Sequence, residues 1–257
     1  MKEFSWKNRK QSLISFLILI ILWEVLAINI NKEIYLPRIE KVILAMFDIL
    51  KSEGFINNLF SSLYRTLISF TSALVLSIIL GILSLMYPFF RNFLRPINAI
   101  GKTIPTMVLV LLALIWFDKD KAPYVVGFAI VFPILYEGIL SSLKEIDKKL
   151  LDMCKVYRVS TKEKILKIYI PSMLFYIMGI LISTLSLAFK VVIAGEVHGQ
   201  PDYGIGAAIQ LEKMNFNTTA IFAWIFIIAL LSLLFEGINK LFIKRVYKWR
   251  DENEIAN

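Results

Sequence analysis

The stretch DMCKVYRVSTKEKILKIYIPS, at residues 152–172, decides how the rest of the chain is interpreted. It is rich in lysine and arginine, yet long apolar runs lie close to it on both sides. In proteins that cross a membrane, lysine and arginine accumulate in the segments that stay in the cytoplasm. We therefore expect this charged block to connect two membrane-spanning segments on the cytoplasmic side.

The composition is that of a membrane protein. Of the 257 residues, 58% are hydrophobic and 19% are charged, whereas a soluble domain has about 45–50% apolar and about 25% charged residues. The net charge of +9 is spread over short segments between apolar runs, so we expect contact with a lipid bilayer and no nucleic acid partner. With one cysteine, Cys154, and one histidine, His198, neither an internal disulfide nor a zinc site is expected.

Six stretches are long and apolar enough to cross the hydrocarbon core as helices, which takes about 20 residues. The first is expected to stay in the protein, because no small-residue cleavage site of a signal peptide follows it. The sequence therefore predicts an all-α membrane protein with six transmembrane helices in a single domain, residues 1–257. The expected spans lie at about residues 12–30, 66–87, 96–117, 122–143, 172–195 and 214–237.

The distribution of positive charge predicts the orientation in the membrane. Lysines and arginines are concentrated in the first ten residues and in residues 91–95, 144–172 and 240–250. Six crossings place all four segments on one side, which the positive-inside rule assigns to the cytoplasm. Both termini are therefore expected there. The outer segment, residues 31–65, has charged and apolar residues at helical spacing and is expected to lie along the membrane surface.

The loop at residues 144–171 is long enough to carry its own secondary structure. Met153, Val156 and Tyr157 recur at i, i+3 and i+4, which predicts a short helix with one apolar face. This face either binds another protein or lies on the lipid headgroups.

A second short helix is expected to follow in the same loop. It can start at Ser160 or Thr161, because Glu163 stands three residues after Ser160 as a capping box requires. Pro171 suits the first turn of the next membrane helix. The loop is therefore predicted to form a small helical knob at the cytoplasmic face.

This knob resembles the cytoplasmic EAA loop of binding-protein-dependent ABC transporter permeases. The family pattern is E-A-A, three residues, G, nine residues, I-x-L-P. The spacing matches throughout. The glycine of the pattern, which can adopt a positive φ, is replaced here by Arg158. The turn therefore either keeps that conformation at a cost of about 1 kcal/mol or takes another course. The residues that correspond to the pattern are Asp152, Met153 and Cys154, then Lys155, Val156 and Tyr157, then Arg158, and finally Ile168, Ile170 and Pro171.

Further fragments are similar to the nitrate/sulfonate/taurine-type branch of these permeases, and they occur in the order and at the spacing of that branch. The resemblance therefore covers nearly the whole chain. The fragments are YLPRIEKV at 35–42, RTLISFTSALVLSIILGILSLMY at 65–87, IPTMVLVLLALIWF at 104–117, FPILYEGIL at 132–140 and AGEVHGQPDYGIGAAI at 194–209.

The resemblance implies the permease fold of type I ABC importers and a location in the cytoplasmic membrane. It implies a homodimer that binds two cytoplasmic ABC ATPase subunits through the knob and receives solute from an extracytoplasmic binding protein. ATP and Mg²⁺ would bind the ATPase, so no cofactor and no enzymatic activity are expected in this chain. The expected substrate is a small anion such as an alkanesulfonate, taurine or nitrate. A thiamine-precursor pyrimidine or another small heterocycle is the alternative.

Three charged residues are candidates for the substrate pathway. Lys190 lies deep within the fifth expected span, where a charge is costly and usually faces a pore or a partner. It either assists an anion across the subunit interface or pairs with Glu137 in the fourth span. Glu196 corresponds to an acidic position at the mouth of the pore in the family, or it caps the outer loop.

Two other classes of membrane protein fit the sequence less well. A membrane-embedded enzyme needs a nucleophile, a base or metal ligands that converge on one site, and the sequence offers only scattered charges. A secondary transporter or channel often has inverted repeats and broken helices, and neither is evident in the sequence.

Overall fold

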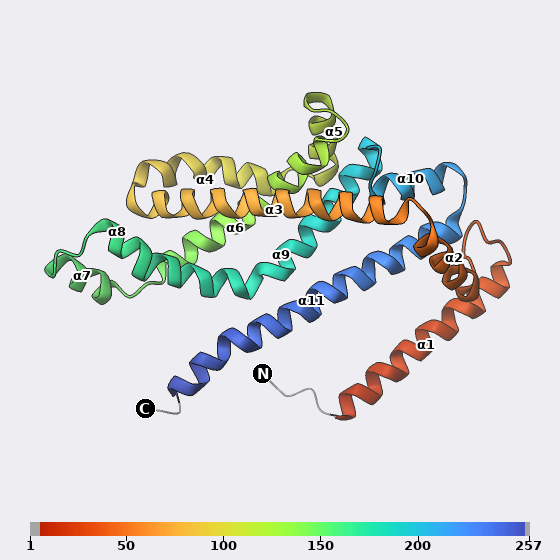
Figure 1. Cartoon of the computed structure of the whole chain (residues 1–257), viewed down its shortest axis with the longest axis horizontal. Coiled ribbons are helices and arrows are strands. Elements are labelled where there is room, and N and C mark those ends of the chain that lie inside the picture. Colours follow the sequence, from red (N-terminus) through yellow and green to blue (C-terminus); the bar gives the residue numbers. More distant parts are fainter. Residues whose placement is uncertain (1–5, 255–257) are drawn as a thin grey trace. The chain divides into compact units, whose positions relative to one another are not determined.

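The computed structural model describes residues 6–254, and every regular element in this range is helical (Figure 1). The two chain ends, for which a cytoplasmic position is expected, lie outside the described residues. The helices are α1 (Trp6–Ile30), α2 (Ile39–Lys51), α3 (Phe55–Met86), α4 (Pro88–Thr103), α5 (Thr106–Trp116), α6 (Ala122–Lys144), α7 (Lys148–Val156), α8 (Thr161–Lys164), the π-helix η1 (Ile165–Tyr169), α9 (Ile170–Gly199), α10 (Ile205–Met214) and α11 (Thr218–Glu254).

The chain divides into two compact units, which are described separately. The first, called here the peripheral unit, comprises Met1–Ile56 and Ala208–Leu230. The second, called the central unit, comprises Asn57–Ala207 and Leu231–Asn257. The knob and all three pathway candidates belong to the central unit.

Five helices in the described part of the chain are long and apolar enough to cross a membrane, or six if the bent pair α4 and α5 counts as one span. The expected fourth, fifth and sixth spans correspond to α6, α9 and the first part of α11. The second span begins earlier than expected, at Phe55 of α3. The outer segment before it is therefore shorter, and its helix is α2.

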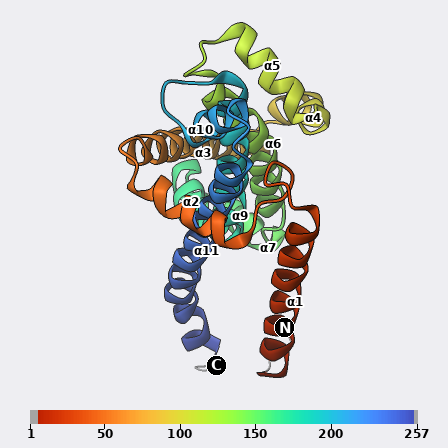
Figure 2. The same ribbon diagram turned by 90° about the vertical axis from the view of Figure 1, so that its right-hand side faces the viewer.

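The third expected span, residues 96–117, is wrong as a single helix. The helices α4 and α5 meet at an angle of 106°, and both views show α5 turning away from α4 (Figures 1 and 2). Pro105 cannot donate a backbone hydrogen bond and disfavours a helical conformation at the residue before it. Ile104 accordingly has an extended conformation, with φ −67° and ψ 125°.

The core of the central unit forms where α3, α6 and α9 meet. Gly127 allows α6 to approach α9 closely, because a Cβ at this position would lie 2.8 Å from Cγ2 of Val192. Gly138 lies against Tyr176 in the same way, so α6 and α9 pack along much of their length. The apolar cluster beside this contact contains Phe70, Ala73, Val131, Leu135 and Ala188.

In the peripheral unit, α1 is tied to the start of α2 by polar contacts. The indole Nε1 of Trp23 donates to the Pro37 carbonyl at 2.9 Å. Glu24 interrupts the apolar run of α1, and its Oε2 accepts a hydrogen bond from the backbone N–H of Ile39 at 3.3 Å. This N–H is at the first turn of α2 and has no partner within that helix. The carboxylate in the first span thus has a structural role as a cap.

Candidate functional site

The charged loop folds into the two short helices that the sequence predicts. The side chain of Asp147 caps α7 by accepting a hydrogen bond from the Lys149 N–H at 2.8 Å. Ser160 caps α8: its Oγ accepts from the Glu163 N–H at 3.2 Å, and Glu163 Oε2 accepts from the Ser160 N–H at 3.3 Å. This reciprocal pair confirms the expected capping box.

The turn between α7 and α8 keeps the conformation of the family glycine. Arg158 has φ 50°, in the left-handed region that favours glycine. Its N–H donates to the Lys155 carbonyl at 3.1 Å, and the next N–H, from Val159, donates to Cys154 at 2.9 Å. These two bonds form a Schellman motif, which satisfies the last carbonyls of a helix. The hydrogen bonds that end α7 therefore stabilise the left-handed backbone conformation of Arg158.

Arg158→Gly is expected to stabilise this turn, because glycine adopts a left-handed conformation without the strain of a Cβ. We expect a gain of about 1 kcal/mol, seen as roughly fivefold slower hydrogen exchange of the α7–α8 amides. Arg158→Ala removes the same charge but keeps the strain, so it serves as the control. Equal exchange in both variants would contradict a strained turn.

The knob presents an apolar face to its surroundings in the single chain. Met153, Val156 and Tyr157 are 50%, 78% and 75% exposed. Cys154, on a neighbouring side of α7, is buried. Asp152 pairs with Lys155 at 2.7 Å, and this hydrogen bond raises the pKa of the lysine. The knob therefore has a buried anchoring side and an exposed apolar side that lies among charges.

The end of the family pattern falls on a π-helical turn that leads into α9. Ile168 lies within η1, and Ile170 and Pro171 begin α9. Pro171 has no N–H to donate to the carbonyl four residues earlier. At the preceding residue, the N–H of Ile170 donates to the carbonyl of Ile165, five residues earlier, which is the hydrogen bond of a π-helix. Such single π-turns often mark functional positions in helices, and this one joins the knob directly to a membrane helix.

Glu137 and Lys190, considered above as a possible pair, do not meet. The carboxylate of Glu137 pairs with Lys102 of α4 instead. The antiparallel contacts of α6 and α9 place Lys190 level with about residue 129 of α6, roughly eight residues or about 12 Å along the helix from Glu137. Lys190 is exposed in the single chain and has no ion pair among the described residues.

Glu196 is completely buried near the end of α9 and holds the loop before α10. Its Oε2 accepts hydrogen bonds from the Ser62 hydroxyl at 2.6 Å and the Gly206 N–H at 3.0 Å. A Cβ at Gly206 would lie 2.6 Å from Cβ of Glu196, so only glycine brings this N–H so close. The geometry corresponds to the loop-capping interpretation of Glu196, and its place in a substrate pathway stays a prediction.

Arg65 of α3 completes this network and was not expected from the sequence. Its Nη1 donates to Glu196 Oε1 at 2.9 Å and to the Tyr203 carbonyl at 2.6 Å, and its Nη2 lies 3.2 Å from Asp120. A polar stripe on α3 was the available signal, because Ser62, Arg65 and Ser69 lie on one face at i, i+3 and i+7.

The model of the family described as "binding-protein-dependent transport system inner membrane component" matches residues 73–248. The chain belongs to this family. The match includes the knob, the π-turn and all three pathway candidates, and it confirms the family expected from the sequence. The permease is therefore a multi-pass protein of the cytoplasmic membrane and a translocation component of a transport system.

Curated relatives of the permease are named for different solutes. It is 24% identical to an aliphatic sulfonates transport permease of Bacillus subtilis, over 98% of this chain and 91% of the relative. It is 27% identical to a formylaminopyrimidine transport permease of Halalkalibacterium halodurans, over 88% of this chain and 90% of the relative. The chain is thus similar over most of its length both to a relative named for an anion and to a relative named for a pyrimidine, the two kinds of substrate that the sequence allowed.

The fold is similar to that of a solved transporter structure. An inward-facing structure of the methionine ABC transporter MetNI includes a chain that matches with a TM-score of 0.60 and 16% identity, over 76% of this permease and 99% of that chain. The helical fold is therefore shared with this chain of an ABC transporter.

Proposed function

We propose that this permease is the membrane subunit of an ATP-driven importer that moves a small anion, such as an alkanesulfonate, taurine or nitrate, into the cell. The observation that carries this proposal is the exposed apolar face of α7, displayed on a capped helical knob within a basic loop. An apolar surface of this kind on a charged, membrane-adjacent loop favours a protein partner. The proposed partners are two cytoplasmic ABC ATPase subunits, which carry the ATP and Mg²⁺.

The connections of the knob suit the transmission of motion. Its α7 follows α6 after a short turn, and its α8 continues through η1 into α9. These two membrane helices pack closely on each other in the core of the central unit. A rigid-body shift of the ATPase would therefore move α6 and α9 together in each of two copies. An extracytoplasmic binding protein delivers the solute to the opposite side in this proposal.

The preference for an anion comes from Lys190. A lysine within a membrane helix costs about 2.5–3.5 kcal/mol on insertion scales, unless it faces a pore or a partner. Lys190 has no ion pair among the described residues of its own chain, so the dimer pore is its proposed environment. The sulfonate-permease relative supports the anion, while the formylaminopyrimidine-permease relative supports a small heterocycle as the second candidate.

The double substitution Met153→Asp with Tyr157→Asp tests the docking of the ATPase. Both side chains are at least half exposed, so the permease should still fold, while two charges would have to be buried in the interface. We expect at least tenfold less ATPase to co-purify with the permease. Phe216→Asp is the control, because Phe216 is 75% exposed in the loop before α11, on the proposed outer side. Full ATPase recovery with the double variant would contradict the docking surface.

A further inference from the structure

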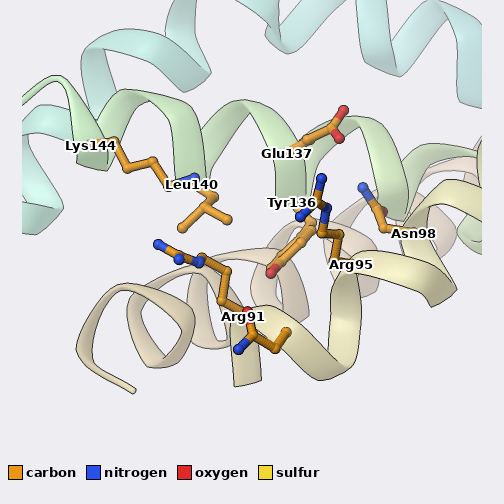
Figure 3. A pocket seen from close by; sticks show the side chains of 8 residues that line it. Arg91, Arg95, Asn98, Tyr136, Glu137, Leu140 and Lys144 are labelled. Carbon is orange, nitrogen blue, oxygen red and sulfur yellow. The ribbon is translucent and has the colours of Figure 1, made fainter. Parts of the chain in front are cut away.

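A basic cavity of about 420 Å³ lies between α4 and α6 of the central unit. Figure 3 shows the side chains of Arg91 and Arg95 extending from α4 toward α6, where Lys144 and Tyr136 lie. Arg91 and Arg95 lie in the first turns of α4, which begins at Pro88, and Lys144 is the last residue of α6, at the end that leads into the knob. The cavity is therefore separate from the Glu196 network near the other end of α9.

The positive charge around this cavity is not balanced by the protein. Arg91, Arg95 and Lys144 have no ion pair among the residues that the structure describes. Glu137 is the one acidic lining residue, and its carboxylate already pairs with Lys102. Three cations that converge on one cavity repel one another unless an anion lies between them. Guanidinium groups bind phosphate and related oxyanions through parallel N–H···O bonds.

A buried polar atom in the lining also lacks a partner. Asn98 is 4% exposed, and its Oδ1 accepts no hydrogen bond from any described residue. A buried amide oxygen without a donor costs free energy, so such atoms are nearly always satisfied by protein, water or a ligand. Asn98 lines the cavity beside Arg95 and Tyr136. A ligand with a hydroxyl or ammonium group next to its anionic group would satisfy this oxygen and neutralise the arginines at once.

We propose that this cavity binds an oxyanion group, phosphate or sulfonate, that carries a hydrogen-bond donor. Arg91, Arg95 and Lys144 bind the anionic oxygens, and Asn98 accepts from the donor. The same chemistry occurs in an acidic phospholipid headgroup, such as phosphatidylglycerol, and in a free anion that leaves the pore. The cytoplasmic location of the site rests on the proposed function. The binding of an oxyanion in the cavity does not.

The test measures thermal unfolding of the full chain with two probes. The first probe is inorganic phosphate, added at constant ionic strength to permease in detergent that lacks acidic lipid. The second is phosphatidylglycerol, introduced into phosphatidylcholine nanodiscs. A ligand that binds only the folded state raises the unfolding midpoint, and we expect a rise of about 2–4 °C with at least one probe. Protection by phosphate indicates a free anion, and protection by phosphatidylglycerol alone indicates a lipid.

Arg91→Gln with Arg95→Gln is expected to weaken the effective probe at least tenfold. Both arginines are exposed and unpaired in the described structure, so the variant should fold. Lys144→Gln provides a second, independent removal of charge from the cavity. The matched control is Lys51→Gln with Lys213→Gln, which removes two exposed lysines elsewhere. No protection by either probe, or equal protection of the arginine variant and the control, would overturn the proposal. Neither readout needs transport or an ATPase, so the result is independent of the proposed function.

Discussion

Glu196→Gln is expected to destabilise the central unit by about 3–5 kcal/mol, because it leaves the buried guanidinium of Arg65 without its fully buried counter-ion. Side chains of Arg65 and Glu196 are 8% and 0% exposed, so water cannot replace the lost charge. The amide also cannot accept as many hydrogen bonds as the carboxylate that now serves Ser62 and Gly206. The loop before α10 should open together with this network.

The measurement is the fraction of protein that stays monodisperse after heating in detergent. Lys119→Ala is the control, because Lys119 pairs with Asp202 in the same part of the central unit but both side chains are about half exposed or more. Exposed pairs contribute about 0–1 kcal/mol. Removal of both charges, Arg65→Met with Glu196→Gln, should cost less than the sum of the single changes. A single Glu196→Gln variant as stable as the Lys119→Ala control would show that the network contributes no stability.

Lys190→Met is expected to abolish uptake while the permease still assembles with its ATPase and basal ATP hydrolysis continues. Methionine is similar in length and is compatible with a membrane helix, and Lys190 has no ion pair in the described chain that the change could break. The substitution removes the one charge that we place in the dimer pore. A loss of uptake with normal assembly therefore separates a transport role from a structural one.

Lys190→Arg is the matched variant, because it retains the positive charge at the same position on α9. We expect it to keep a measurable part of the uptake, whereas the methionine variant keeps none. The readouts are uptake of a radiolabelled sulfonate by reconstituted transporter and ATP hydrolysis in the same vesicles. Normal uptake by Lys190→Met would refute the pathway role, and loss of assembly would assign Lys190 to an interface between subunits.

Local rules explain the features that the sequence predicted well. The capping box at Ser160 depends on residues within one turn of each other, so a local pattern is enough to predict it. Pro171 lies in the first turn of α9 as expected, but the helical backbone continues into this turn from α8 through η1. The break between α4 and α5 was also encoded locally, by Pro105. Hydropathy does not indicate this break, because the apolar run continues through Pro105. Hydropathy counts apolar residues and does not show whether they form one continuous helix.

Contacts between distant residues could not be predicted in the same way. Whether Glu137 faces Lys190 or Lys102 depends on how α6 and α9 are aligned, and that alignment follows from close packing at Gly127 and Gly138. Arg65 lies more than a hundred residues from Glu196 along the chain. A polar stripe on a helix indicates that it has a partner without indicating which one.

The sequence by itself determined that the chain has several helices apolar enough to cross a membrane, the approximate position of most of them, and the permease family to which it belongs, because hydropathy, caps and motif spacing act over one or a few helical turns. Only the tertiary structure decided the buried network around Glu196 and the basic cavity beside Arg95. These depend on which helix faces meet, and packing in three dimensions selects one arrangement among many that a one-dimensional pattern permits.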